Sequence, residues 1–269
     1  MNKTVREWVR RREITGKPLF SFSDLKVAFP SSSDQLLLNN LSRLKHERIL
    51  YSPYKSFYVV LPPQYVLIGS VPASYYMEEL MGRLGKKYYF GLLTAAAMWG
   101  AAHQRPMVDC VMTEPPRLSS AADKRNVRWV YRPSLPVQHA CVKNGEYGVV
   151  RYSSAELTAV ELVQYESHAG GMSRVATVIE ELLEATDFAH AADGVFRVCK
   201  DTAIQRLGYI VEKEIGDERQ GEVIYHEWVR CCPAPHFIPL GVRSDGQVTH
   251  RDERWKIDVN MVIERDEHS

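Results

Sequence analysis

The sequence predicts an α+β protein in which an N-terminal winged helix-turn-helix precedes a larger mixed α/β domain. Residues 19–62 have the order short helix, turn, longer amphipathic helix and hairpin. Positive charge is concentrated at the same end, since residues 1–55 hold eleven Lys/Arg against five Asp/Glu, a net charge of +6. The whole chain carries only +1, which leaves about −5 for the remaining 214 residues. We therefore expect two domains, with residues 1–62 in the first and residues 63–269 in the second.

The first predicted helix covers residues 3–13 and places Val5, Trp8 and Val9 on one side. Three arginines end it at residues 10–12. A basic triplet at a helix C-terminus suits the helix dipole and could also contact phosphate. The sequence Gly16-Lys17-Pro18 then breaks the chain.

The second predicted helix begins at Ser21 and ends at Phe29. Ser21 and Asp24 have the spacing of a capping box, and Phe20 with Leu25 can form a hydrophobic staple around it. Pro30 cannot continue the helix, and residues 31–34 supply a turn and a new N-cap.

The third predicted helix covers residues 34–48 and is amphipathic. Its apolar sector holds Leu37, Leu41 and Leu44, flanked by Leu36 and Leu38. The opposite sector is polar and can hydrogen-bond base edges or phosphates; it contains Gln35, Asn39, Ser42, Arg43 and His46. In an isolated amphipathic helix such a sector is more often a solvated face. The segment that follows favours the DNA-binding interpretation.

That segment is a predicted hairpin. Residues 49–51 and 57–61 are rich in β-branched and aromatic side chains, and they flank a polar turn that contains Pro53. A hairpin directly after a candidate recognition helix is typical of a wing. The expected DNA-binding residues are Ser32, Gln35, Asn39, Ser42, Arg43, His46, Tyr54 and Lys55.

Helices and strands are mixed along residues 63–269. Helices are expected at residues 74–84, 89–102, 153–165, 173–184 and 195–207. Gly85 and Gly208 would stop the first and the last of them, Ser153 and Glu156 have the spacing of a capping box, and Gly170-Gly171 separates the third from the fourth. Strands are expected at residues 108–113, 127–131 and 147–152, the last returning from an Asn144-Gly145 turn, and in an alternating segment at residues 255–263.

The sequence offers little chemistry for an enzyme. It has no glycine-rich phosphate loop, and the one acidic-x-Lys triplet, Asp24-Leu25-Lys26, lies within the DNA-binding segment. Gly69-Ser70 lacks the pair of acids that a nucleotidyltransferase needs after it. We therefore expect neither catalytic residues nor an enzymatic activity.

Cysteine usage and hydropathy indicate a cytoplasmic protein without metal or other cofactor. The five cysteines form no C-x-x-C pair, and their odd number favours a reducing compartment. Zinc binding by Cys231, Cys232 and His236 is disfavoured because adjacent cysteines suit a tetrahedral site poorly. No apolar run approaches the ~20 residues of a membrane-spanning helix, so no membrane partner is expected.

Several short motifs resemble one protein family in order and spacing. They are Phe22-Ser23-Asp24-Leu25, Asn40-Leu41-Ser42-Arg43-Leu44, Phe57-Tyr58-Val59, the stretch at residues 88–96 leading to His103-Gln104-Arg105-Pro106, Leu157-Thr158-Ala159 with Gly170-Gly171, Gln205-Arg206-Leu207-Gly208-Tyr209, and Trp255-Lys256-Ile257 with Asn260. On these motifs the chain resembles the AbiEi-type antitoxins of bacterial type IV toxin-antitoxin (abortive infection) systems. Residues 210–250 match none of its motifs.

The resemblance implies an operon autorepressor and antitoxin. Its head would bind double-stranded DNA at operator inverted repeats, and its second domain would counteract a nucleotidyltransferase-like toxin, with or without stable direct contact. Two other classes stay open on the sequence. One is a ligand-responsive winged-helix regulator whose second domain binds a small molecule, and the other is an enzyme with a DNA-binding head, which would need a catalytic constellation that the sequence does not show.

Overall fold

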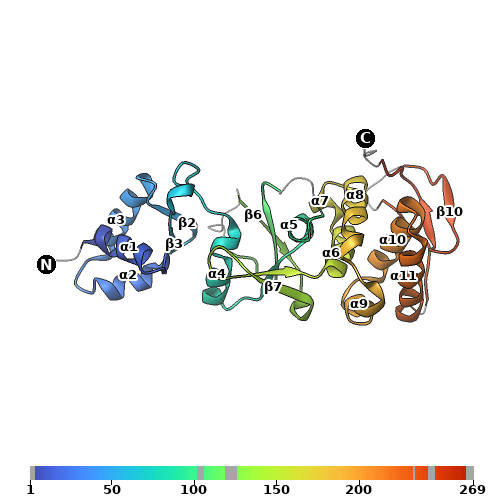
Figure 1. Cartoon of the computed structure of the whole chain (residues 1–269), viewed down its shortest axis with the longest axis horizontal. Coiled ribbons are helices and arrows are strands. Elements are labelled where there is room, and N and C mark those ends of the chain that lie inside the picture. Colours follow the sequence, from blue (N-terminus) through green and yellow to red (C-terminus); the bar gives the residue numbers. More distant parts are fainter. Residues whose placement is uncertain (1–3, 102–105, 119–125, 233, 242–245, 265–269) are drawn as a thin grey trace. The chain divides into compact units, whose positions relative to one another are not determined.

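The computed structural model describes residues 4–101, 106–118, 126–232, 234–241 and 246–264 (Figure 1). Within them the chain is a mixed α+β protein with eleven α-helices and three sheets, which confirms the predicted fold class. It divides into two compact units. The first consists of Met1–Tyr88, Thr113–Pro133 and Lys143–Val150, and the second of Tyr89–Met112, Ser134–Val142 and Arg151–Ser269.

The N-terminal part of the first unit is a small helical head with a three-stranded sheet (Figure 1). Its helices are α1 (Val5–Ile14), α2 (Phe22–Ala28) and α3 (Asp34–His46), and its strands are β1 (Leu19–Ser21), β2 (Leu50–Tyr54) and β3 (Phe57–Val60). The strands are antiparallel in the order β1-β3-β2. This arrangement is compatible with a winged helix-turn-helix. Strand β1 is not among the predicted elements.

The core of the head is built where the apolar pattern placed it. The predicted inner residues of α1 and α3 are all buried, and Trp8 packs edge-on against Phe20 at 5.0 Å between ring centroids. The predicted capping box of α2 is present, since Ser21 and Asp24 exchange hydrogen bonds of 2.7 and 3.2 Å. The helix that was expected to reach residue 48 ends at His46.

The first unit continues beyond the hairpin. It includes the 3₁₀ turns η1 (Pro63–Tyr65) and η2 (Ala73–Tyr75), helix α4 (Met77–Leu84) and strand β6 (Val127–Tyr131). Arg83 of α4 pairs with Asp24 at 3.0 Å, and Arg48 donates a hydrogen bond of 2.9 Å to the carbonyl of Leu67. The head thus has partners after residue 62. The functional boundary at that residue stays a prediction.

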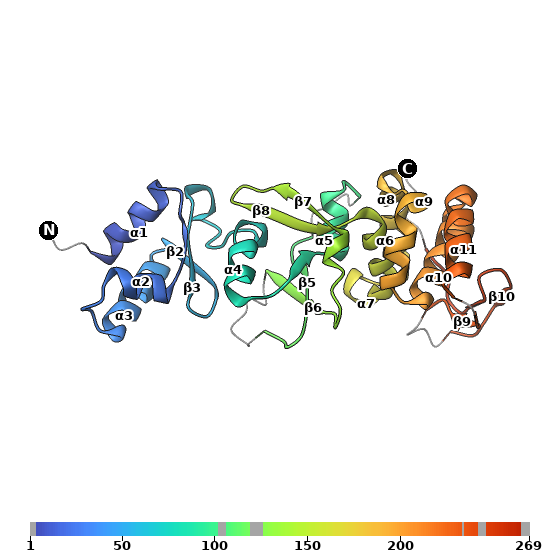
Figure 2. The same cartoon turned by 90° about the horizontal axis from the view of Figure 1, so that it is seen from below.

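Five strands form the largest sheet, in the order β6-β5-β4-β8-β7 (Figure 2). Besides β6 they are β4 (Tyr88–Phe90), β5 (Asp109–Thr113), β7 (Ala140–Asn144) and β8 (Val149–Ser153). The turn at Asn144-Gly145 closes the β7–β8 hairpin, where the amide of Gly145 donates to the carbonyl of Gly148 at 2.9 Å. Strand β4 pairs in parallel with β8, with Phe90 opposite Tyr152.

The helix predicted for residues 89–102 is wrong at its start. Residues up to Phe90 form a strand, and the helix that follows is α5 (Leu92–Met98). Gly91 separates the two elements because a Cβ there would lie 2.6 Å from Cγ of Met112, so that only a glycine lets the chain pass so close to β5. The aromatic residues before it are strand formers, which the apolar pattern alone did not reveal.

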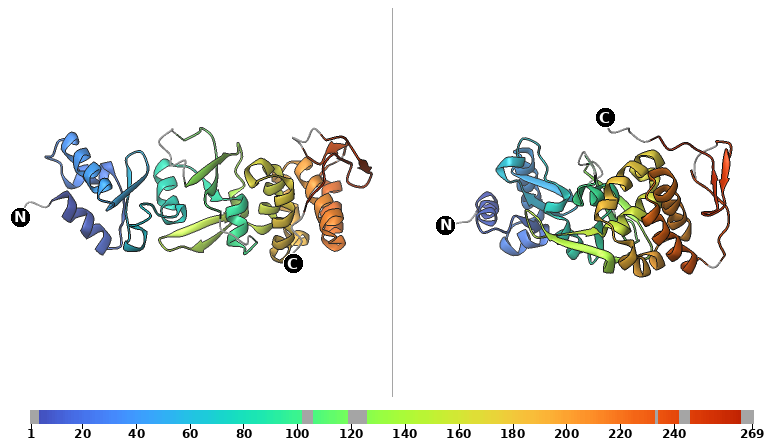
Figure 3. Two further views of the ribbon diagram at one scale, coloured as in Figure 1. Left: turned by 90° about the horizontal axis from the view of Figure 1, so that it is seen from above. Right: turned by 45° about the vertical axis from the view of Figure 1, so that its right-hand side comes forward.

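The second unit contains most of the helices. Besides α5 they are α6 (Ala155–Gln164), α7 (Glu166–Ala169), α8 (Met172–Leu182), α9 (Phe188–Val195), α10 (Asp201–Tyr209) and α11 (Glu218–Cys231). The unit also has the short 3₁₀ turns η3 (Val137–His139), η4 (Leu183–Ala185) and η5 (Phe196–Val198) and a π-helical segment η6 (Ile210–Ile215). Helix α10 contacts both α6 and α11 (Figure 3). Three short strands, β9 (Ile238–Pro239), β10 (His250–Asp252) and β11 (Ile257–Val259), form a sheet in the order β10-β11-β9.

Several expectations for this unit are wrong. The cap of α6 is Ser154, whose hydroxyl accepts from the amide of Leu157, whereas Glu156 accepts a hydrogen bond from the amide of Asp187. The helix predicted for residues 195–207 is divided between the end of α9, η5 and α10, and α11 was not predicted. Gly208 lies inside α10 and does not stop it; the predicted strand at residues 255–263 is reduced to β11.

Among the described residues, no helix is both long and apolar enough to cross a membrane.

Candidate nucleic-acid interface

Helix α3 presents one apolar side to the head and one polar side to solvent. Its N-cap is Ser33, whose hydroxyl accepts from the amide of Leu36 at 3.3 Å. Leu37, Leu41 and Leu44 are buried in the core of the head. The predicted polar sector is exposed along the opposite side and comprises Gln35, Asn39, Ser42, Arg43 and His46. The five candidate residues on this helix therefore share one solvent-facing surface.

Two amide side chains are held together on this surface. Nε2 of Gln35 donates to Oδ1 of Asn39 at 2.9 Å, one helical turn apart. This bond uses the amide nitrogen of Gln35 and the carbonyl oxygen of Asn39, and within the described residues the remaining carbonyl oxygen of Gln35 and amide nitrogen of Asn39 make no hydrogen bond. An acceptor and a donor thus point outward together, which is the pair of groups that can bind an adenine edge in the major groove.

Arg43 is part of an ion-pair group that also includes a residue of α1. Its Nε lies 3.7 Å from Oε1 of Glu47, and the other carboxylate oxygen of Glu47 pairs with Arg6. Two guanidinium groups therefore share one carboxylate beside the polar side of α3. The sequence does not reveal the role of Arg6, because no local pattern connects residues that lie 41 positions apart.

Ser32 lies at the turn before α3 and is half-buried. Its carbonyl accepts from Nζ of Lys26 at 2.7 Å, and the same ammonium group pairs with Asp34 at 2.6 Å. The turn is thereby attached to α2, and the charge of Lys26 is balanced locally.

The predicted wing is short and tightly turned. The hydroxyl of Ser52 donates to the carbonyls of Tyr54 and Phe57, both at 3.0 Å, and Ser56 adopts a left-handed conformation with φ of 59°. The carbonyl of Ser56 accepts from the amide of Phe22, which ties the tip to α2. Lys55 is exposed at the tip and Tyr54 is half-buried. The structure therefore places the candidate wing residues on a separate element from the α3 surface, within the same unit.

The three arginines at the end of α1 have different surroundings. Arg10 and Arg11 are exposed. Arg12 instead donates to the carbonyl of Leu19 at 2.5 Å and lies over the ring of Trp8 at 5.0 Å. Burial lowers the pKa of Arg12, and the carboxylate of Asp24 opposes this shift. Arg12 thus stabilises the head, whereas its two neighbours are available to an anion.

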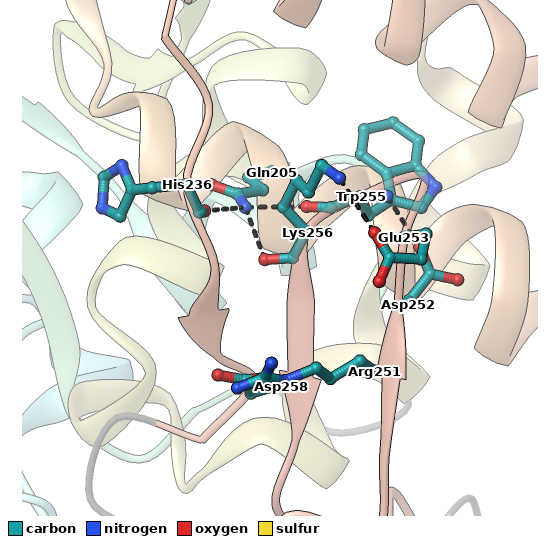
Figure 4. Close-up of polar contacts among 8 residues, drawn as sticks. All are labelled: Gln205, His236, Arg251, Asp252, Glu253, Trp255, Lys256 and Asp258. Atoms are coloured by element: carbon teal, nitrogen blue, oxygen red, sulfur yellow. Dashed lines mark hydrogen bonds and ion pairs between the residues drawn. The ribbon is translucent and has the colours of Figure 1, made fainter.

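The motifs near the C-terminus meet in one buried polar cluster of the second unit (Figure 4). Nε2 of Gln205 donates to the carbonyls of Trp255 at 2.7 Å, Lys256 at 2.9 Å and His236 at 3.1 Å. The ring of Trp255 lies against Gly208, where an added Cβ would come within 2.0 Å of it. These motifs therefore serve packing. The stretch His103-Gln104-Arg105 lies outside the described residues.

Comparison with known proteins extends the resemblance seen in the sequence. No curated protein matches the chain. Among solved structures, the RV2827C protein from Mycobacterium tuberculosis is similar, with a TM-score of 0.65 over 95% of this chain and 92% of that one. The two share 13% sequence identity, so this likeness concerns the fold alone.

A family model matches a large part of the second unit. The AbiEi antitoxin C-terminal domain family matches residues 89–213, which include β4 from its second residue, β5 to β8 and the helices α5 to α10. This range holds three of the seven motif groups on which the resemblance is based, apart from Tyr88 at the start of the first of them. Residues 89–213 are therefore similar to the AbiEi antitoxin C-terminal domain, and the resemblance to AbiEi-type antitoxins is confirmed.

Proposed function

We propose that this protein is the DNA-binding autorepressor and antitoxin of a type IV toxin-antitoxin system. The observation that carries the DNA-binding part is the polar side of α3, which is exposed as a continuous surface on a segment with a net charge of +6. A helix of this width enters the major groove, and local positive charge supplies affinity for phosphate. The proposed contacts are Ser32, Gln35, Asn39, Ser42, Arg43, His46, Tyr54 and Lys55.

The antitoxin part of the proposal assigns neutralisation to residues 63–269 and DNA binding to residues 1–62. It is supported by the family of residues 89–213 and by the charge difference, since the chain outside residues 1–55 is net negative. The proposed target is a nucleotidyltransferase-like toxin in the cytoplasm. A toxin that holds nucleotide or RNA must present a basic site, which an acidic domain can oppose more readily than a basic head can.

Operator binding tests the first part. Asn39→Ala and Arg43→Ala together should weaken binding to the DNA upstream of the protein's own gene, and the Arg43 change alone should cost about 1 to 3 kcal/mol if it contacts a base or a desolvated phosphate. Arg219→Ala, an equal loss of charge on exposed α11, is the matched control. An unchanged gel-shift affinity of the double variant would exclude α3 from the groove.

Footprinting of the same complex tests whether the operator contains an inverted repeat. One head buries too little surface for high specificity, so we expect two protected half-sites in inverted order. A single unpaired footprint at saturating protein would contradict this arrangement.

Rescue from the toxin tests the division of labour. The gene adjacent in the operon is expressed with full-length wild-type protein or with the Asn39→Ala/Arg43→Ala variant, and growth is measured. We expect both proteins to restore growth, because the variant loses operator binding and keeps the second unit intact. A variant that is folded and abundant but no longer rescues would assign antitoxicity to the head as well.

A cleft in the second unit favours a second candidate, the ligand-responsive regulator. Its volume is about 330 Å³, and it is lined by Phe196, Arg197, Asp201, Arg230 and Cys231. Two arginines and an aromatic ring suit a small ligand that carries an anionic group, while Asp201 in the same lining and the pairing of Arg230 with Glu227 reduce the net positive charge there. The growth experiment separates the candidates, since a plain regulator has no toxic neighbour to counteract.

A further inference from the structure

Two leucines of α3 are exposed although the buried side of the helix is already complete. Leu36 is 54% exposed and Leu38 is 44% exposed, whereas Leu37, Leu41 and Leu44 fill the contact with the core. The sequence pattern had placed Leu36 and Leu38 at the edges of the apolar sector. The packing of the head therefore does not account for them.

Both leucines lie beside the outward-facing amide pair. Leu38 follows Gln35 by three residues, and Leu36 precedes Asn39 by three, a spacing that makes side chains neighbours on a helix surface. At 100° per residue the two leucines fall on opposite sides of the hydrogen-bonded Gln35 and Asn39. The first two turns of α3 thus present an apolar, amide, apolar stripe. The N-terminal turns of a recognition helix are the part that reaches base edges.

This stripe matches the chemistry of an A·T pair in the major groove. Adenine presents N7 and N6, which a Gln or Asn side chain can bind through two hydrogen bonds, and thymine presents a C5-methyl group that favours apolar contact. We propose that α3 reads A·T pairs, with Gln35 and Asn39 binding adenine and Leu36 and Leu38 contacting thymine methyl groups. This inference rests on the proposed DNA binding and specifies which bases the head selects.

Replacing thymine with uracil in the probe isolates the methyl group. Uracil lacks only the C5-methyl and keeps the pairing with adenine, so a probe amplified with dUTP in place of dTTP differs from the normal one at every such methyl. The probe is the double-stranded region upstream of the protein's own gene. Full-length wild-type protein should bind the thymine probe about three- to tenfold more tightly than the uracil probe, as expected for one or two buried methyl groups.

The leucine variants assign that preference to α3. Leu36→Ala/Leu38→Ala should bind both probes with nearly equal affinity, and each single variant should show an intermediate ratio. Ile14→Ala is the matched control, because Ile14 is 75% exposed on α1 and lies outside the stripe, and it should keep the wild-type ratio. The four positions of the stripe are exposed, so the double variant should retain the wild-type melting temperature. An effect of uracil on DNA shape would change the affinity ratio of wild type and double variant alike. The difference between the two ratios therefore measures the methyl contact alone.

The outcomes separate this inference from the proposal on which it rests. Equal wild-type affinity for the two probes, or a thymine preference that is as large in a folded double variant as in wild type, overturns methyl reading and leaves DNA binding standing. No binding to either probe above that to unrelated DNA overturns both.

Discussion

The head and the C-terminal layer at residues 201–263 differ in how far apart their stabilising partners lie in the chain. In the head, α2 is capped by a serine three residues before its partner Asp24, and α3 by Ser33 three residues before Leu36. In the C-terminal layer the amide of Gln205 binds the carbonyl of Trp255 across 50 residues. In the head, the helix ends are therefore determined by residues close in sequence. In the C-terminal layer, contacts with residues far away in the sequence determine which side chains fit at a position.

This difference determines what each region loses when one residue changes. A cap contributes its own hydrogen bond and little else, whereas Trp255 contacts several elements at once. Its ring lies 5.6 Å from that of Trp228 and 5.3 Å from that of Tyr225, and its Nε1 donates to Glu212 at 2.9 Å. We therefore expect larger effects in the layer than in the head.

The largest effect is expected from Trp255→Ala. The side chain is fully buried, so its removal should lower the free energy of unfolding by about 3 to 5 kcal/mol. Urea denaturation followed by circular dichroism measures the loss, with Trp255→Phe as a variant that keeps part of the ring volume and should lose less. A loss below about 1 kcal/mol would show that the layer does not depend on this residue.

A smaller loss, about 1 to 3 kcal/mol, is expected from Gly208→Ala because the added methyl group meets the ring of Trp255. The sign is informative, since Ala is otherwise favoured over Gly in a helix by about 1 kcal/mol. Gly82→Ala in α4 is the matched control, because a Cβ there has open space and should stabilise the protein. If both changes stabilise, Gly208 has no packing role and the distant contact with Trp255 is unimportant.

Gly208 also shows where sequence reasoning stops. A glycine after an apolar helical pattern ordinarily indicates a helix end, and only a tryptophan 47 residues later explains why this one lies inside α10. Helix α11 was missed in the same region, where no motif of the family could be placed. By contrast, the core residues of α1 and α3, the Ser21 cap and the hairpin were predicted, because each depends on neighbours within a few positions.

In the candidate interface, too, features set by neighbouring residues were predictable and features set by distant residues were not. The polar sector of α3 follows from its period, and the structure shows its residues exposed together. Arg6 could not be predicted, because its contact with Glu47 depends on how α1 packs against α3. The exposure of Leu36 and Leu38 could not be predicted either, since residues at the edge of an apolar sector can be buried or solvent-facing according to the width of the partner surface.

In the head, Ser21→Ala should cost about 1 kcal/mol, less than either change in the layer. The hydroxyl of Ser21 accepts from the amide of Asp24 at 3.2 Å, and Arg83 also donates to it at 3.2 Å. Thermal denaturation measures the loss, and Ser31→Ala, an exposed serine in the turn after α2, should leave the melting temperature unchanged. A cost for Ser21→Ala as large as that for Trp255→Ala would show that the head, too, depends on a residue shared by several elements.

The smallest predicted effect is a pH dependence confined to the head. Burial on its own would raise the pKa of Asp24, but the hydrogen bonds from Ser21 and the charge of Arg83 outweigh it and hold the pKa below its usual value. The folded state therefore binds this proton less readily than the unfolded state does, and the carboxylate stabilises the fold at pH values above the unfolded pKa of about 3.9. This contribution is lost as the pH falls through the lower folded pKa. Because Asp24 is about one-third exposed, solvent screening should keep it below about 1 kcal/mol.

The measurement is the stability difference between wild type and Asp24→Asn from pH 7 to pH 3. We expect wild type to be more stable at neutral pH and the difference to shrink below about pH 4, because protonated Asp24 then resembles the neutral amide. Gln205→Leu is the counterpart in the C-terminal layer. It removes a neutral amide from three carbonyls, so its cost should stay constant over the same range. A difference for Asp24→Asn that is also constant with pH would mean that the charge contributes nothing and that only the local cap geometry holds the start of α2.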